Sequence, residues 1–177
     1  MFTLGACGEK NEPEGHNHNI IEEGQTEEDN KEVKGMIYAV SGADKESLLS
    51  TEFSCNGGVI TPERISAGLS GWTGLKFRIS SSTDETTKTI TIDWLSDASI
   101  IADAVPDTVR ESFTFASVKE LQVFMLNSLC YSIQANLGKE YDVFYTVNGE
   151  DIGSLGIEGL SSATAFNKTD SEFVFVK

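Results

Sequence analysis

The sequence predicts an α+β fold, a small mixed or antiparallel sheet with two helices packed on one face. Two observations support this prediction. Segments in which apolar and polar residues alternate are interleaved with two amphipathic helical segments. Neighbouring strands are joined by hairpin-like connections rather than by uniform helical crossovers, which is typical of α+β domains. The folded part is expected to span residues 36–177, a length that suits one domain with its own core.

The first two elements are expected to be strands. "GMIYAVS" (35–41) is a nearly continuous apolar run. "SLLSTEFSC" (47–55) alternates, so that one face carries Leu49, Thr51, Phe53 and Cys55. The glycines that follow in "NGG" end the second strand.

A short helix is expected in "TPERISAGLSGWTG" (61–74). Thr61 is the expected N-cap, Pro62 the first helical residue, and Gly71 or Gly74 the end. Because they recur at spacings of about four and three, the apolar residues of this segment form one stripe that should pack on the sheet. The stripe consists of Ile65, Leu69 and Trp72.

An antiparallel hairpin is expected next. "LKFRIS" (75–80) alternates strictly, and the polar segment 81–87 is expected to be the connecting loop. In "KTITIDWL" (88–95) the same alternation returns, which predicts a second strand with one apolar face. That face consists of Ile90, Ile92 and Trp94.

The longest helix is expected to start after Ser117, which forms an S-x-x-E capping box with Glu120, and to stop at Gly138. Asn127 is expected at an exposed polar position of this helix. The apolar stripe comprises Val118, Leu121, Met125, Leu129, Ile133 and Leu137.

The C-terminal part is expected to hold a strand from residue 141, a turn and a return segment. Asn148-Gly149 favours a type I′ turn because a positive φ is accessible to both residues. "EFVFVK" (172–177) is the expected last strand.

The N-terminal residues resemble a lipidation signal. Leu4-Gly5-Ala6-Cys7 resembles a bacterial lipobox, in which the cysteine thiol receives a diacylglyceryl group. Residues 1–7 are therefore interpreted as the remnant of a signal peptide, since they are too few for a complete leader. The expected location is the extracytoplasmic face of the cell membrane, with the lipid on Cys7 as the anchor.

Residues 8–35 are expected to form a disordered acidic tether. They contain nine acidic and three basic residues and hardly any apolar ones, so they cannot bury enough surface to fold. His16 and His18 lie here, and two histidines without further ligands favour a solvated linker over a metal site. The chain carries a net charge of −15, which argues against nucleic acid as a partner.

The ordered set of segments resembles the GerMN domain of sporulation and germination lipoproteins. The resemblance rests on "VITPERISAGL", "TIDWLS", "LNSLCYSI" and "VNGEDIGSLG", in that order, and covers about residues 36–167. It implies a fold similar to ring-building modules and an assembly role in the cell envelope, during sporulation or germination. The implied partner is an envelope protein or a second copy of the chain, and the family has no established enzymatic chemistry.

The residues themselves also argue against an enzyme. Both histidines lie in the tether, so the folded part cannot form a Ser-His or Cys-His pair, and no catalytic residue, metal site or cofactor is predicted. Asp93, Asp97 and Asp103 could in principle serve a glycosidase or bind Ca²⁺, but solvated surface carboxylates are the commoner case.

Two further pairs of residues leave alternatives open. Cys55 and Cys130 are interpreted first as small core residues, with a disulfide as the alternative outside the cytoplasm. Trp72 and Trp94 are interpreted as core residues, and the alternative is that they are sugar platforms of a cell-wall glycan-binding module. Peptidoglycan is therefore the alternative partner.

Overall fold

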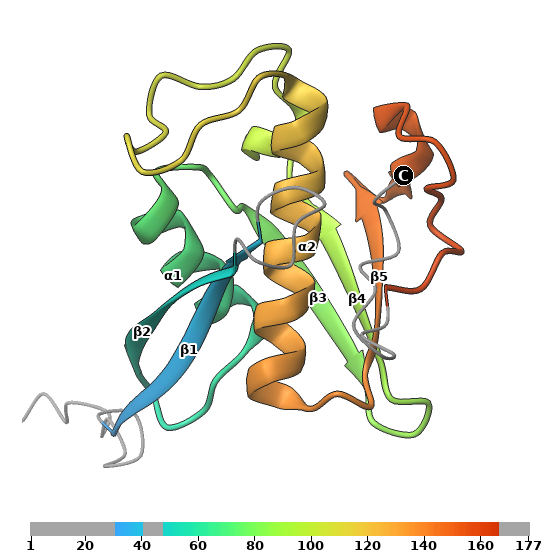
Figure 1. Ribbon diagram of the computed structural model, residues 1–177. Helices are drawn as coiled ribbons and strands as arrows, with labels where there is room; N and C mark the ends of the chain where they lie inside the picture. The colour runs from blue at the N-terminus through green and yellow to red at the C-terminus, as the bar shows by residue number, and fades with distance from the viewer. Residues whose placement is uncertain (1–30, 41–47, 167–177) are drawn as a thin grey trace, which may run out of the picture.

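The computed structural model of the protein describes residues 31–40 and 48–166 (Figure 1). Cys7, both histidines, most of the tether and the expected last strand at 172–177 lie outside these residues. The elements are, in chain order, β1 (Glu32–Val40), β2 (Leu48–Asn56), α1 (Pro62–Thr73), β3 (Ile79–Asp84), β4 (Thr89–Trp94), the 3₁₀ helix η3 (Ser99–Ile101), α2 (Val118–Leu137), β5 (Asp142–Val147), β6 (Glu150–Asp151) and the 3₁₀ helix η4 (Ile152–Leu155).

The predicted α+β class is confirmed, with the strands divided between two sheets. A four-stranded mixed sheet has the order β3-β4-β5-β6, in which β4 and β5 run parallel and the other neighbours antiparallel. The parallel pair is connected through α2, which lies across the sheet (Figure 1). β1 and β2 form a separate antiparallel ribbon, called the ribbon below, which packs beside α1 and α2.

One face of the four-stranded sheet forms the core. The alternating residues of β4 and β5 that point to this face are buried, and both helices pack against it. The hydroxyl of Tyr145 donates a hydrogen bond to the carbonyl of Leu126 in α2, at 2.9 Å. Burial raises the pKa of Tyr145 well above its ordinary value of 10.0, so this hydroxyl stays neutral as part of the core. The buried side chains of β4 and β5 are those of Ile90, Ile92, Trp94, Val143, Tyr145 and Val147.

The predicted helix ends are largely confirmed. Thr61 caps α1 by accepting a hydrogen bond from the Arg64 N–H, and Gly74 ends it in the left-handed conformation, with φ 79°. The hydroxyl of Ser117 accepts a hydrogen bond from the N–H of Glu120. The Glu120 carboxylate reaches back to the N–H of Ala116, one residue before the position that a standard capping box uses.

Two strand boundaries differ from the prediction. β1 begins at Glu32, so residues 32–35 belong to the ribbon and not to the tether. β3 begins at Ile79 and extends to Asp84 through part of the predicted loop. The polar residues of this extension can pair with β4 because the other face of the sheet is exposed.

The segment 75–77 before β3 is extended but pairs with no strand, and pairing begins at Arg78, whose carbonyl accepts a hydrogen bond from the N–H of Leu95. Its alternation is real, because Leu75 and Phe77 are buried. Its backbone groups bond elsewhere, since the Lys76 N–H donates to the Ser99 hydroxyl and the Phe77 N–H to the Ser70 hydroxyl. Alternation therefore predicted the burial correctly, and the predicted pairing with the next strand holds from Arg78 onward but not for residues 75–77.

Two predictions about single residues have opposite outcomes. The type I′ turn is supported by positive φ values at Asn148 (51°) and Gly149 (77°). Asn127 is not exposed as expected but only 1% accessible. The helix that carries it is covered by the sheet, by β1 and by the loop that holds Phe113 and Phe115. None of the helices in the described ranges is long and apolar enough to cross a bilayer.

Candidate interaction surface

The structure separates the three aspartates that follow β4. Asp93 supports the β5–β6 turn, because its Oδ1 accepts hydrogen bonds from the Thr146 hydroxyl at 2.6 Å and from the Gly149 N–H at 2.7 Å. Asp97 forms an exposed ion pair with Arg78, and Asp103 is exposed in the following loop. Within the described ranges, no group of three or more His, Cys, Asp or Glu side chains is arranged to hold a metal ion.

The cysteines and tryptophans of the folded part are core or near-core residues. Cys130 is buried, Cys55 is half-buried, and they are not joined in a disulfide. Trp94 is fully buried, which excludes its ring as a sugar platform. Trp72 is half-buried, with its ring edge-on to Phe113 at 5.5 Å between centroids.

One edge of the ribbon is covered by a polar ladder, which we define as Ser128, Ser132 and Asn136 of α2. These residues lie four apart on the helix, and each accepts one hydrogen bond from a backbone N–H of β1. The three donors are every second residue of that strand. The bonds run from Met36 to Asn136 at 3.1 Å, from Tyr38 to Ser132 at 2.9 Å and from Val40 to Ser128 at 3.0 Å.

The two spacings match because of helix and strand geometry. Four residues of an α-helix rise about 6 Å, and two residues of a strand rise about 6.6–6.8 Å. Ser132 and Asn136 also donate to the carbonyls of Tyr38 and Met36, so both kinds of backbone group on this edge are bonded. The edge of β1 that faces α2 is therefore unavailable to another strand.

The outer edge of β5 is also covered. β6 pairs with Thr146 and Val147, and Phe166 exchanges two backbone hydrogen bonds with Val143. Of the two sheets, β2 and β3 each keep one edge that no described strand occupies.

The outer edge of β2 is the longer of these two edges. Residues of an antiparallel strand point their backbone groups alternately toward one neighbour and the other. Met36, Tyr38 and Val40 direct their backbone N–H groups toward α2. The residues of β1 that lie between them therefore bond to β2. By the same register, the N–H and carbonyl groups that β2 directs outward include those of Leu48, Ser50, Glu52 and Ser54.

The ribbon also carries the exposed apolar side chains. All four large hydrophobic residues that are exposed in the described ranges lie on β1, on β2 or just after β2. These are Met36, Leu48, Leu49 and Val59, with exposures of 37%, 37%, 50% and 63%. An open edge with exposed apolar side chains is typical of strand pairing with another chain.

Charge on the ribbon is nearly balanced, although the chain as a whole is strongly acidic. The two strands carry Lys34, Glu32 and Glu52, Lys31 directly precedes β1, and the connecting residues 41–47 contain two acidic residues and one lysine. Lys34 and Glu52 form an exposed ion pair at 2.8 Å, and the hydrogen bond that Lys34 donates to the Glu52 carboxylate raises the pKa of Lys34. A partner can therefore approach this region without meeting the net negative charge of the rest.

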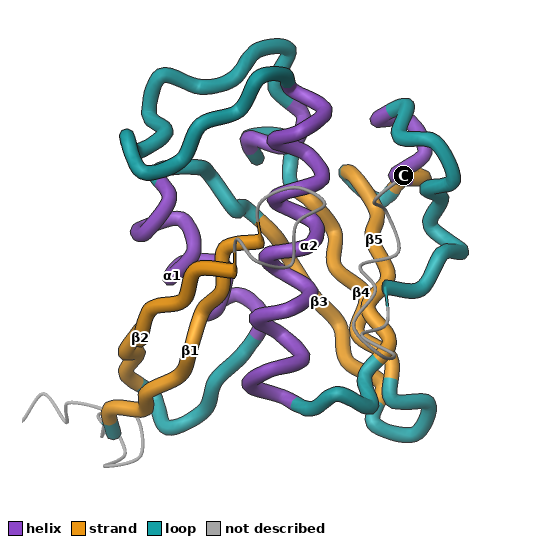
Figure 2. Tube along the Cα trace, viewed as in Figure 1, coloured by secondary structure: helices purple, strands orange, loops and turns teal. Residues whose placement is uncertain are grey.

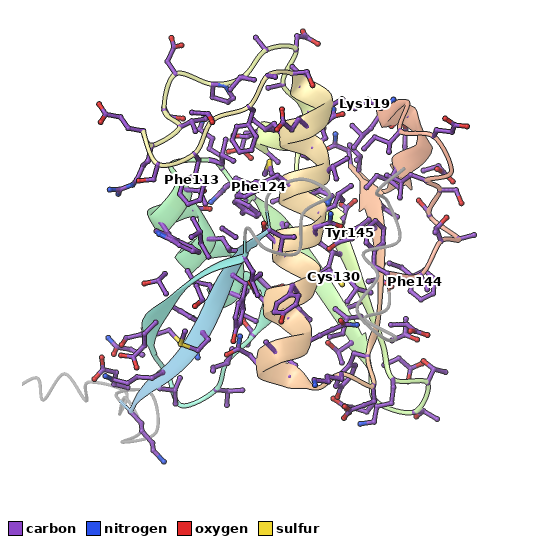
Figure 3. All side chains as sticks on the ribbon, in the orientation of Figure 1. Phe113, Lys119, Phe124, Cys130, Phe144 and Tyr145 are labelled. Carbon is purple, nitrogen blue, oxygen red and sulfur yellow. The ribbon has the colours of Figure 1, made fainter. Side chains whose placement is uncertain are left out.

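A second surface is the open face of the four-stranded sheet, opposite the core. The sheet register aligns nine of its residues in three rows across β3, β4 and β5, and none of them is buried. Phe144 is the only aromatic residue among the nine; Figure 3 shows it on the side of β5 away from Tyr145. The rows are Ser80, Asp93 and Thr146, then Ser82, Thr91 and Phe144, then Asp84, Thr89 and Asp142.

Neither the open edge of β2 nor the open face of the four-stranded sheet could be located from the sequence alone. Phe144 follows the alternation of β5, but only the register shows that hydroxyl side chains of two other strands surround it. The polar ladder has a visible spacing of four, but its partner β1 lies about a hundred residues earlier in the chain. The chain matches no protein-family model, and no curated protein and no solved structure matches it either.

Proposed function

We propose that the protein is an extracytoplasmic lipoprotein, anchored through Cys7, whose folded domain is a non-catalytic protein-interaction module. Its partner is a protein of the cell envelope, and the proposed role lies in sporulation or germination, which is supported by the resemblance of the sequence to the GerMN family. The observation that supports this best is the outer edge of β2, an unpaired strand edge flanked by exposed apolar side chains.

The proposal depends on the contrast between this edge and the others. An extended chain that joins β2 gains backbone hydrogen bonds from Ser50, Glu52 and Ser54, and its side chains meet Leu48 and Leu49. The corresponding groups of β1 are already bonded to the polar ladder, and β5 is covered by β6 and Phe166. β3 is shorter and lies beside α1, whose Glu63 carboxylate accepts a hydrogen bond from Ser81.

The anchor is tested by the variant Cys7→Ser, expressed with a complete leader. We expect the wild-type protein in the membrane fraction and the variant in the soluble extracytoplasmic fraction, because a diacylglyceryl group contributes about 0.8 kcal/mol per buried CH₂. Cell fractionation and a label for the lipid would measure this. Equal membrane association of both proteins would show that Cys7 is not the anchor.

The binding edge is tested by Ser50→Pro. Proline removes the outward N–H of Ser50 and leaves the bonds between β1 and β2 intact, so we expect the fold to persist and partner binding to fall about tenfold or more. The measurement is crosslinking to a detergent extract of the source membrane. The matched control is Thr83→Pro on the outer edge of β3, which should bind normally. If Ser50→Pro and Thr83→Pro both bind like the wild type, β2 is not the interaction edge.

The second candidate function is binding of a cell-wall glycan at the open face of the four-stranded sheet. The observation that favours it is Phe144, a half-exposed ring surrounded by hydroxyl and carboxylate side chains that could bond to sugar hydroxyls. Purified peptidoglycan distinguishes the two functions. Saturable retention that Phe144→Ala removes and Ser50→Pro does not, with no crosslinked protein partner, would replace the assembly proposal with this one.

A further inference from the structure

We propose that the outer edge of β2 pairs antiparallel with β2 of a second copy of this chain. The two ribbons then form one four-stranded sheet across a two-fold axis that passes beside Thr51. This inference rests on the proposed function, which assigns the same edge to a protein partner, and it specifies the partner and the register.

The backbone directions limit the registers that are allowed. Outward residues of one copy must face outward residues of the other, so that each such pair exchanges N–H···O bonds. With the axis at Thr51, Ser50 faces Glu52 of the second copy and Leu48 faces its Ser54. Thr51 then faces Thr51 of the second copy as a non-hydrogen-bonded pair, in which side chains approach most closely.

Side-chain pairing favours this register over its neighbours. An axis at Glu52 would place the two Glu52 carboxylates directly opposite each other, which is destabilising. An axis at Phe53 would leave Leu48 and Leu49 without a partner residue. The axis at Thr51 sets Leu49, which is 50% exposed, opposite Phe53 of the second copy, and it pairs two β-branched threonines.

A second copy can approach this edge because the ribbon is close to neutral. Two chains of net charge −15 repel each other over most of their surfaces, but residues 31–56 carry three lysines and four acidic residues, a net charge of only −1. The ribbon also projects from one side of the molecule, away from β5 (Figure 2). The acidic remainder of the two copies therefore stays apart, and added salt should strengthen the pairing by screening that repulsion.

The test is a disulfide at the axis. In the full chain with Cys7→Ser and Cys55→Ser, the variant Thr51→Cys should form a crosslinked dimer on mild oxidation. The two Cα atoms of such a non-hydrogen-bonded pair lie about 4.5 Å apart, within the range that a disulfide spans. Ser54→Cys is the matched control on the same strand, because its two copies would lie about 20 Å apart. We expect Thr51→Cys to crosslink at least tenfold faster.

The mass of the reduced protein provides a second measurement. Sedimentation should show a dimer of the 19.2 kDa chain that Ser50→Pro weakens about tenfold or more. Equal crosslinking rates at positions 51 and 54, or a dimer that Thr51→Cys does not crosslink, would overturn the proposed pairing. If the chain stays monomeric but Ser50→Pro still loses the envelope partner, only the self-pairing is wrong and the proposed function stands.

Discussion

Replacement of Trp94 by alanine is expected to lower the free energy of unfolding by about 3–5 kcal/mol, the usual cost of removing a large buried aromatic ring. Trp94 is fully buried and lies between two other rings of the core. Its ring centroid is 5.9 Å from that of Phe77 and 6.0 Å from that of Tyr145. Because the core is closely packed, the neighbouring side chains cannot collapse fully into the space that the ring leaves.

Denaturant unfolding followed by circular dichroism would measure the loss. Trp72→Ala is the matched control, because Trp72 is only half-buried and should cost less. Trp94→Phe should cost less than Trp94→Ala, because it keeps a ring and removes an indole N–H that has no hydrogen-bond partner in the described part of the chain. A cost for Trp94→Ala no larger than that for Trp72→Ala would contradict the position of Trp94 at the centre of the core.

Trp94 also shows which features of the fold could be predicted from the sequence. The alternation of β4 predicted three buried side chains, and Ile90, Ile92 and Trp94 are each 0% exposed. The spacing of three and four in α2 predicted the middle of its core stripe, because Leu121, Met125, Leu129 and Ile133 are fully buried, whereas the end residues Val118 and Leu137 are half-buried. Both are local signals, because period alone determines which face of an element is apolar.

Features that depend on contacts between distant segments could not be predicted in this way. Asn127 has the same local context as an exposed helix residue, and only the packing of three other segments around α2 buries it. The serines of β3 were predicted to lie in a loop, because polarity alone does not distinguish a loop from a strand with one solvent-exposed face. The candidate interaction edge follows from the polar ladder, whose partners lie 88–100 residues away in sequence.

Removal of the polar ladder by Ser128→Ala, Ser132→Ala and Asn136→Ala together is the second large effect we expect. The change leaves three backbone N–H groups of β1 without their partners, and an unpaired buried group costs about 1–3 kcal/mol. The stability costs of the three single variants should follow the burial of the hydrogen bonds that they remove. Ser128→Ala should cost most because the bond to Val40 is buried, and Asn136→Ala least because water can replace the exposed bond to Met36.

Hydrogen exchange of the amides of Met36, Tyr38 and Val40, together with denaturant unfolding, would test this ranking. Ser66→Ala is the matched control, because the Ser66 hydroxyl bonds only to the Glu63 carbonyl of its own helix turn. Unchanged exchange at the three amides would mean that the ladder does not hold the ribbon.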